Sequence, residues 1–428
     1  MWILFNIKTT PKRRKIEMEI RVNQTIPIER EWVTEAYLKL RKGGKGTGVD
    51  EESWKTFDKK LTSNLHTIWS RLASGSYHPN AVREVEIPKK DGTVRKLGIP
   101  TLRDRISQQV VKEYMENRID RIFHQDSYGY RPLKSAHEAL RTVIKNCYQY
   151  DWVIDMDISK FFDEIDHEIM LKAVSHVMPE KWVSMYVKRW LEMPIQDKDG
   201  SIRNKEGKGT PQGGVISPLL ANLYLHFTLD KWFDKNHPDV RFVRYADDIV
   251  VHCKSERQAQ HILTHIKQRL GEVKLSIKES KTKIAYCKDY RRKANHEHVT
   301  FDFLGFSFKP SKMIMKDKQI LLGFLGDISK SSKKKIMEEF RINKAMKHTD
   351  LEIQDIAARI NSKLIGWTNY YGLFTKRGLN TCFYNFNKRI LKWIRKKYKT
   401  GSKEALNMFE MIRKEKPELF YHWSKGYC

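Results

Sequence analysis

The chain has 428 residues, enough for two or three domains with buried cores. It carries 81 Lys and Arg against 52 Asp and Glu, a net charge of +29, and 40% of its residues are hydrophobic and 11% aromatic. This hydrophobic and aromatic content excludes a disordered polybasic chain. We therefore expect a folded protein that binds a polyanion, most often nucleic acid. On charge alone, an anionic membrane surface and a merely soluble basic protein remain as alternatives.

The five cysteines indicate no zinc ribbon and no secreted disulfide framework, because their number is odd and no two have C-x-x-C spacing. The opening MWILFNIKTTPKRRK is too short for a signal peptide and has its apolar stretch before its charges. The longest uncharged run, Gly209 to Leu229, contains two prolines and several polar residues and does not predict a membrane span. We therefore expect a protein of a reducing cytoplasm.

The first third of the chain predicts helices followed by a strand pair. Residues 1–30 are charged and irregular and predict a basic arm. Residues 31–75 predict helices, interrupted by the glycine-rich KGGKGTGVD. Residues 82–100 predict two strands joined by a turn at Asp91-Gly92. Further helices are predicted around 104–123 and 135–148.

From Tyr150 to about Phe308, short apolar segments alternate with helical ones, which indicates an α/β or α+β domain. The predicted strands are WVIDMDI, RFVRYADDIVVHC, VKLSI, TKIAYC and FDFLGFSF. Beyond about Ser311 the pattern predicts helices that are basic and aromatic. Residues 331–428 carry 22 Lys and Arg against 9 Asp and Glu, a net charge of +13.

Two adjacent acids, Asp247 and Asp248, lie between two β-branched runs and are predicted at the tip of a hairpin. Adjacent carboxylates repel, so such a pair is favourable where a divalent cation lies between it and a third acid. Asp157, at the C-terminal end of the strand that also carries Asp155, is the candidate third acid. Two metal ions about 4 Å apart can activate a primer 3′-hydroxyl and stabilise a pyrophosphate leaving group.

Each acid also has a simpler interpretation. Taken singly, Asp155, Asp163 and Asp166 favour surface, turn or helix N-cap positions over metal ligation. The Asp247-Asp248 pair alone is also compatible with an ordinary hairpin turn.

Three motifs, in this order along the chain, resemble those of group II intron-encoded reverse transcriptase/maturases. VIDMDISKFFDEIDH is similar to the first carboxylate motif, GTPQGGVISPLLANLYL to the template- and substrate-binding motif, and FVRYADDIV to the catalytic hairpin. VEIPKKDGTVRKLGIPTLRDRISQQVV is similar to the fingers motif, and INSKLIGWTNYYGLF to the maturase thumb signature. The resemblance covers about residues 31–400.

The resemblance implies an α+β right-hand polymerase, with fingers and a palm built on an antiparallel sheet, followed by an α-helical thumb/maturase domain. The implied divisions are a basic N-terminal arm (1–30), an N-terminal extension with fingers (31–150), the palm (151–310), the thumb/maturase domain (311–400) and a C-terminal tail (401–428).

The implied activity is that of an RNA-directed DNA polymerase, which extends a primer 3′-end with deoxynucleotides on an RNA template under two Mg²⁺ ions, with Mn²⁺ as an alternative. Asp157, Asp247 and Asp248 would be the catalytic metal ligands. The implied substrate-binding residues are Lys89 and Arg95 on the triphosphate, Phe162 against a 2′-hydroxyl, Gln212 and Gly213 beside the nucleotide, and Lys281 as a proton donor to pyrophosphate. The implied partners are an RNA template, a DNA or RNA primer, deoxynucleotides and a structured intron RNA, with no membrane.

The basic C-terminal third predicts RNA contacts at Lys392, Arg395, Lys396 and Lys397, in a run too charged for a core. Trp367, Tyr370 and Phe374 have the spacing i, i+3, i+7, which favours a helix core stripe over base stacking.

Two other functions stay open at this point. One is an RNA-binding splicing maturase whose polymerase is secondary, and the other is a domesticated enzyme that serves repair, CRISPR adaptation or phage defence. We find no Cys-rich HNH-type nuclease segment after the residues that resemble the thumb. If the chain is an intron enzyme, we therefore expect it not to cleave the second DNA strand.

Overall fold

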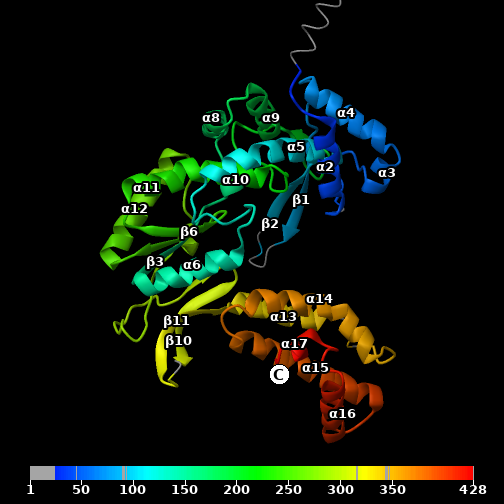
Figure 1. Cartoon of the computed structure of the whole chain (residues 1–428), viewed down its shortest axis with the longest axis vertical. Coiled ribbons are helices and arrows are strands. Elements are labelled where there is room, and N and C mark those ends of the chain that lie inside the picture. Colours follow the sequence, from blue (N-terminus) through cyan, green and yellow to red (C-terminus); the bar gives the residue numbers. More distant parts are fainter. Residues whose placement is uncertain are drawn as a thin grey trace, which may run out of the picture.

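The computed structural model describes residues 25–44, 46–88, 92, 94–314, 317–342, 346 and 348–427. Most of the predicted N-terminal arm, and both Lys89 and Asp91, lie outside the described residues. Figure 1 shows a larger upper part, formed by the chain up to about residue 310, and a smaller helical part below it. A β hairpin joins the two parts at one side, and a gap separates them elsewhere.

The N-terminal helices pack against a long buried helix, α5, beside a four-stranded sheet of order β2-β1-β4-β5. The strands β1 and β2 are antiparallel, as the turn signal predicts, whereas β1 and β4 are parallel. The helices are α2 (Arg30–Arg41), α3 (Trp54–Asp58), α4 (Leu61–Ala73) and α5 (Leu102–Ile119), and the strands are β1 (Val82–Pro88), β2 (Val94–Ile99), β4 (Ile195–Gln196) and β5 (Ile202–Arg203).

The second sheet has the order β6-β7-β3-β8, and all of its neighbouring strands are antiparallel. Successive side chains of a strand point to opposite faces, so both faces of this sheet bury apolar residues. Ile154 and Met156 join the core under α12, whereas Val153 and Val250 join the core under α6. The elements are β3 (Trp152–Asp157), β6 (Arg241–Tyr245), β7 (Asp248–Cys253), β8 (Lys283–Tyr286), α6 (Ala136–Gln149) and α12 (Glu256–Glu272).

Shorter helices fill the remainder of the upper part. They are the 3₁₀ turns η1 (Asp120–Ile122) and η3 (Glu279–Lys281), α7 (Phe161–Glu164), α8 (His167–Val177), α9 (Lys181–Leu191), α10 (Ser217–Leu225), the π-helical turn η2 (His226–Asp230) and α11 (Lys231–Asn236). None of the helices in the described part of the chain combines the length and the apolar character that a membrane crossing requires.

The lower part has a hydrophobic core of its own, built around Phe340, Phe383 and Phe386. A three-stranded antiparallel sheet leads into it. The elements are β9 (Phe301–Phe303), β10 (Phe306–Ile314), β11 (Ile320–Ile328), α13 (Lys330–Ile342), α14 (Ile353–Tyr371), α15 (Arg377–Tyr398), α16 (Ser402–Glu415) and α17 (Tyr421–Ser424).

Three predictions of secondary structure are wrong. The segment FDFLGFSF is not one strand but two, β9 and the start of β10, which pair antiparallel across a turn at Leu304-Gly305, where both residues have positive φ. The segment VKLSI is not a strand; it forms only an isolated bridge between Ile158 and Ile277, because β8 already pairs with β3 over Trp152–Asp155. The chain beyond Ser311 is also not immediately helical, since β10 and β11 pair in register as far as Ile328. Basic composition does not report such cross-strand pairing.

The aromatic stripe is confirmed as packing residues but not as one helix face, because α14 ends at Tyr371 and Phe374 lies in the turn that follows. Trp367 is half-buried against the core of the lower part. Tyr370 and Phe374 pack instead against the cluster that contains Phe306 and Phe308.

Candidate active site

Two acids from distant parts of the chain face each other at one end of the second sheet, where β3 ends and β7 begins. We call this end, with Asp157, Asp247 and Asp248, the acidic edge. Asp157, the last residue of β3, pairs in register with Asp248, the first residue of β7. Asp247 precedes Asp248 in the turn after β6, so the fold brings the three predicted carboxylates together. Lys281 joins them from η3, and its Nζ lies 2.7 Å from Asp157 Oδ2.

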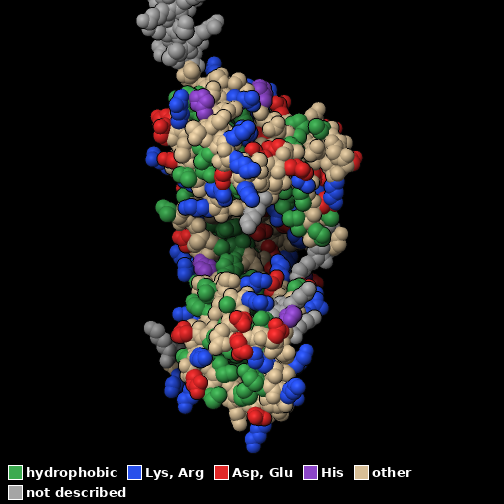
Figure 2. All heavy atoms as spheres, turned by 90° about the vertical axis from the view of Figure 1, so that its right-hand side faces the viewer, with side chains coloured by type: hydrophobic (Ala, Val, Ile, Leu, Met, Phe, Trp, Pro, Cys, Tyr) green, Lys and Arg blue, Asp and Glu red, His purple; other side chains and the backbone are tan. Residues whose placement is uncertain are grey.

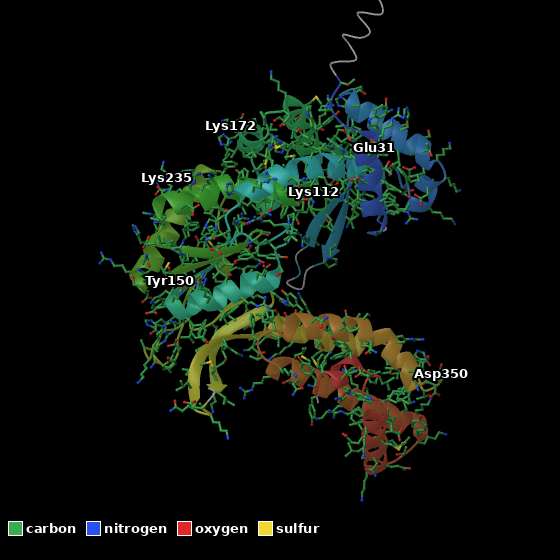
Figure 3. All side chains as sticks on the ribbon, viewed as in Figure 1. Glu31, Lys112, Tyr150, Lys172, Lys235 and Asp350 are labelled. Carbon is green, nitrogen blue, oxygen red and sulfur yellow. The ribbon has the colours of Figure 1, made fainter. Side chains whose placement is uncertain are left out.

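The acidic edge lies at the end of the second sheet that is remote from Tyr150. Tyr150, labelled in Figure 3, marks the end of the sheet at which β3 begins, and Asp157 is the last residue of that strand. Figure 2 shows a hollow between the upper and lower parts, with hydrophobic and some acidic side chains visible inside it and Lys and Arg side chains around its rim. A basic rim is suited to a polyanion.

The carboxylates are partly desolvated and repel one another. Burial, followed by the charges of Asp247 and Asp157, raises the pKa of Asp248 to about 6. Burial and the charge of Asp157 also raise the pKa of Asp247 above its usual range. A divalent cation would relieve this repulsion.

The donor chemistry fits a hard divalent cation, because all three candidate ligands are carboxylates. As the side chains lie, however, no group of three or more His, Cys, Asp or Glu among the described residues is arranged to hold a metal ion. The Lys281 ammonium occupies the side of Asp157 that faces it. Asp157 therefore has one carboxylate oxygen, Oδ2, engaged by an ammonium in this arrangement.

The candidate nucleotide-binding residues are linked across two elements. Arg95 Nε of β2 donates to Gln212 Oε1 at 2.9 Å, and the Gly98 amide donates to the Gln212 carbonyl at 2.9 Å. Gly213 has φ +127°, and a Cβ there would lie 2.7 Å from the Gly98 carbonyl oxygen, so only glycine fits. The charge of Arg95 also acts on Asp247, which connects this pair to the acids.

Phe162 is half-buried on α7 and packs against the main core. Its carbonyl accepts a hydrogen bond of 2.8 Å from the amide of Thr210, at the start of the loop that carries Gln212. The backbone therefore fixes Phe162 next to that loop. Lys89, the other predicted triphosphate contact, lies outside the described residues.

Of the remaining acids, Asp163 and Asp166 take the predicted surface and N-cap positions, whereas Asp155 lies partly buried inside β3 and takes none of the predicted ones. Asp166 is the N-cap of α8, where its Oδ1 accepts from the Ile169 amide at 3.0 Å, and it also pairs with Lys274. Asp155 lies 3.8 Å from Lys283 Nζ, and burial raises its pKa to about 7. Asp163 is exposed on α7.

The candidate RNA contacts on α15 fall into two groups. Lys392, Arg395 and Lys396 are exposed. Lys397 Nζ donates to the Leu351 carbonyl at 2.6 Å and to Glu352 Oε1 at 2.6 Å, so Lys397 holds the start of α14 instead of facing solvent.

One element of the site was not predicted from the sequence. Arg244 and Asp230 form an ion pair beneath the hairpin, with both side chains fully buried. The available signal was an arginine inside an otherwise apolar strand, since arginine is almost never fully buried unless it is paired.

Comparisons with known proteins match two parts of the chain to known families. Residues 87–308, about half of the chain, match the family described as reverse transcriptase (RNA-dependent DNA polymerase). Residues 333–408 match the group II intron, maturase-specific domain.

Several known proteins are similar over much of their length. Protein YkfC of Escherichia coli (strain K12) is 33% identical over 299 residues, which are 60% of this chain and 78% of that protein. The group II intron-encoded protein LtrA of Lactococcus lactis subsp. cremoris is 27% identical over 468 residues, covering 88% of this chain and 74% of LtrA. Among solved structures, telomerase from Candida albicans superposes with a TM-score of 0.45 at 10% identity, covering 87% of this chain and 67% of that one.

Proposed function

From the premise that this chain belongs to the reverse transcriptase family and carries a group II intron maturase domain, we propose that its polymerase site is the acidic edge of the second sheet. Asp157, Asp247 and Asp248 are the proposed ligands of two Mg²⁺ ions, in a family that uses divalent metals. The register of Asp157 opposite Asp248 is the observation that carries this proposal.

The proposed reaction adds a deoxynucleotide to a primer 3′-end on an RNA template and releases pyrophosphate. When bound, the metal ions supply activation of the 3′-hydroxyl and neutralisation of the leaving group. Arg95, with Lys89, holds the triphosphate by charge-assisted hydrogen bonds, and Gln212 keeps the guanidinium in place. Phe162 occupies the space that a 2′-hydroxyl requires, and Gly213 lets the backbone approach the nucleotide.

Lys281 has two proposed roles at different stages. Before metal binding, its ammonium neutralises Asp157. Once released from that carboxylate, it is the proposed proton donor to pyrophosphate, and it lies close enough to act on Asp247 and Asp248 as well.

The test is the double variant Asp247→Ala/Asp248→Ala, assayed for primer extension on an RNA template. We expect extension to be abolished and RNA binding to stay close to that of the unaltered protein, because the basic surface is untouched. Synthesis that persists in a clean preparation of the variant contradicts the assignment.

The lower part is the proposed site for a structured RNA. We propose that Lys392, Arg395 and Lys396 on α15 contact phosphates, because their charges are exposed. With the maturase domain, this supports binding of a group II intron RNA for splicing and mobility. We also propose that fingers, palm, thumb and tail follow the divisions 31–150, 151–310, 311–400 and 401–428.

The identity of the RNA is tested by purifying the protein from its native host and sequencing the RNA that accompanies it. Recovery of one long RNA that spans the protein's own reading frame supports the intron partner. Recovery of a short separate RNA, or of diverse cellular RNA, favours a domesticated enzyme with the same chemistry.

A further inference from the structure

Arg244 is buried completely one residue before the catalytic turn begins. A guanidinium in the interior costs several kcal/mol unless its donors are paired. Its Nε donates to Asp230 Oδ1 at 2.8 Å, and Nη2 donates to the second oxygen of the same carboxylate. Its Nη1 donates to Asn222 Oδ1 at 2.8 Å and to the Ala246 carbonyl at 3.2 Å. The last of these contacts reaches the turn itself.

The turn has a backbone conformation that needs outside support. Ala246 has φ +56°, in the left-handed region that costs a non-glycine residue about 1–2 kcal/mol. Gly129 lies directly against it, and a Cβ on Gly129 would meet the Ala246 nitrogen at 2.4 Å. The Gly129 carbonyl accepts from Asn222 Nδ2 at 2.6 Å. The turn is therefore held on one side by Arg244 and on the other by Gly129, and Asn222 bonds to both.

The same residues connect the catalytic turn to the helix beside the nucleotide. Asn222 lies on α10, which begins three residues after Gly214, the last residue of the loop Pro211-Gln212-Gly213-Gly214. Asp230 ends the π-helical turn that follows α10. Burial is the largest single influence on the pKa of Asp230 and raises it, but the charge and hydrogen bonds of Arg244, together with His226, lower that pKa below its usual range, so the pair is ionised. A buried ion pair contributes little net stability compared with apolar residues of the same size. Net stability therefore does not account for the Arg244–Asp230 pair, whereas its contact with the turn does.

We propose that Arg244, Asp230 and Asn222 are positioning residues, which fix the Ala246 turn so that Asp247 and Asp248 face Asp157. This inference rests on the proposed function of those acids. It predicts that loss of the network weakens the binding of Mn²⁺ to the protein without substrates, as measured by EPR titration, raises the Mg²⁺ concentration required for activity and lowers kcat, while primer-template affinity is kept.

The test replaces the ion pair with apolar residues in Arg244→Met/Asp230→Leu, which removes both charges together and so leaves neither one buried alone. We expect kcat for primer extension to fall about 10²-fold, and half-activation by Mg²⁺ to require at least about threefold more ion, with KM for the primer-template nearly unchanged. Arg244→Lys keeps a charge opposite Asp230 but lacks the fork of donors, and we expect an intermediate loss with the same Mg²⁺ shift.

Arg292→Met is the matched control. Arg292 is also buried, lies at the opposite end of the sheet and donates from Nη1 to the carbonyls of Cys147 and Cys287 at 2.7 and 2.8 Å. We expect this variant to lose stability without a change in the Mg²⁺ requirement.

Each outcome decides the inference. If Arg244→Lys and the double variant have the Mg²⁺ requirement and kcat of the unaltered protein, the inference is overturned. The same holds if Arg292→Met shifts the Mg²⁺ requirement as far as they do, because the readout then follows stability alone. Should the double variant not fold, Arg244→Lys decides by the same criteria. If the unaltered protein extends no primer, it is the proposed function that fails.

Discussion

The second sheet and helix α15 each carry a cluster of like charges, but the two clusters differ in their exposure to solvent. At the sheet edge, Asp157, Asp247 and Asp248 are crowded and partly desolvated, so the pKa values of Asp247 and Asp248 are raised. On α15, Lys392, Arg395 and Lys396 are exposed, and water screens them. We therefore expect the first cluster to bind small cations at defined positions and the second to bind a polyanion of suitable shape.

Each of the two regions also has a main core of its own. The upper part packs around one large cluster, and the lower part packs α13 to α17 around its own aromatic residues. A third cluster lies where the regions meet and includes Val153, Phe306 and, at its border, Tyr370. We therefore expect the stability of one region to be alterable without loss of the chemistry in the other.

The largest effect is expected from Asp157→Asn, which removes one charge from the crowded edge and leaves the volume unchanged. Primer extension should fall on the order of 10³-fold, because the charge that stabilises the transition state is lost. Asp155→Asn is the control on the same strand face, and it should keep most of the activity because Asp155 pairs with Lys283. Equal losses in the two variants would contradict a special role for Asp157.

Next in size is Phe386→Ala, which tests the separation of the cores. Phe386 is fully buried and stacks on Phe340, so truncation should cost the lower part about 3–5 kcal/mol. Urea unfolding followed by limited proteolysis measures it, and the palm should resist the protease as before. Tyr384→Ala, on an exposed position of the same helix, should cost less than about 1 kcal/mol. Simultaneous unfolding of both parts would refute independent cores.

A smaller effect should appear as pH dependence in each region, because each buries a neutral histidine. Burial lowers the pKa of His252 and of His422 to about 3, from the usual 6.5. The folded state then excludes a proton that the unfolded chain binds, so stability is complete above pH 6.5 and falls as the pH drops toward 3. From pH 7 to pH 5, each histidine should cost about 2 kcal/mol.

The His252→Leu variant isolates the contribution of the palm. Neither ring nitrogen of His252 has a hydrogen-bond partner among the described residues, so the substitution should change stability little at pH 7. His422 Nε2 lies 2.9 Å from Asn387 Oδ1, and His422→Leu should therefore lose about 1 kcal/mol at pH 7. Urea titrations at pH 5, 6 and 7 measure the slope of unfolding free energy against pH for both variants. An unchanged slope in His252→Leu would show that His252 is not the group responsible.

The smallest effect concerns the exposed cations. Changing Lys392, Arg395 and Lys396 to Gln should weaken RNA binding about tenfold at moderate salt and reduce the salt slope by about 2, as expected for three phosphate contacts on single strands. Lys397→Gln should leave that slope unchanged and lower stability instead, since it pairs with Glu352. Filter binding across a salt series measures the slopes. Identical slopes in all three proteins would remove α15 from the RNA interface.

Several parts of the fold could be predicted from local patterns. The strand pair before and after Asp91-Gly92, the hairpin around Asp247 and the helices of the last hundred residues follow from periodicity and turn chemistry, which act over a few residues. The segment VKLSI shows the limit of that reasoning. Its apolar pattern suits a strand, but β8 already occupies the edge of β3.

The candidate site divides in the same way. The sequence by itself determined the family of the chain and predicted which acids, glycines and aromatic residues carry the chemistry, because their motifs are short and their order is fixed. Only the tertiary structure decided that Asp157 lies opposite Asp248, that Arg244 finds Asp230, and that Lys397 turns inward while Lys396 does not. Strand register and side-chain burial depend on which distant elements pack into the same core. A short stretch of residues does not specify those distant partners.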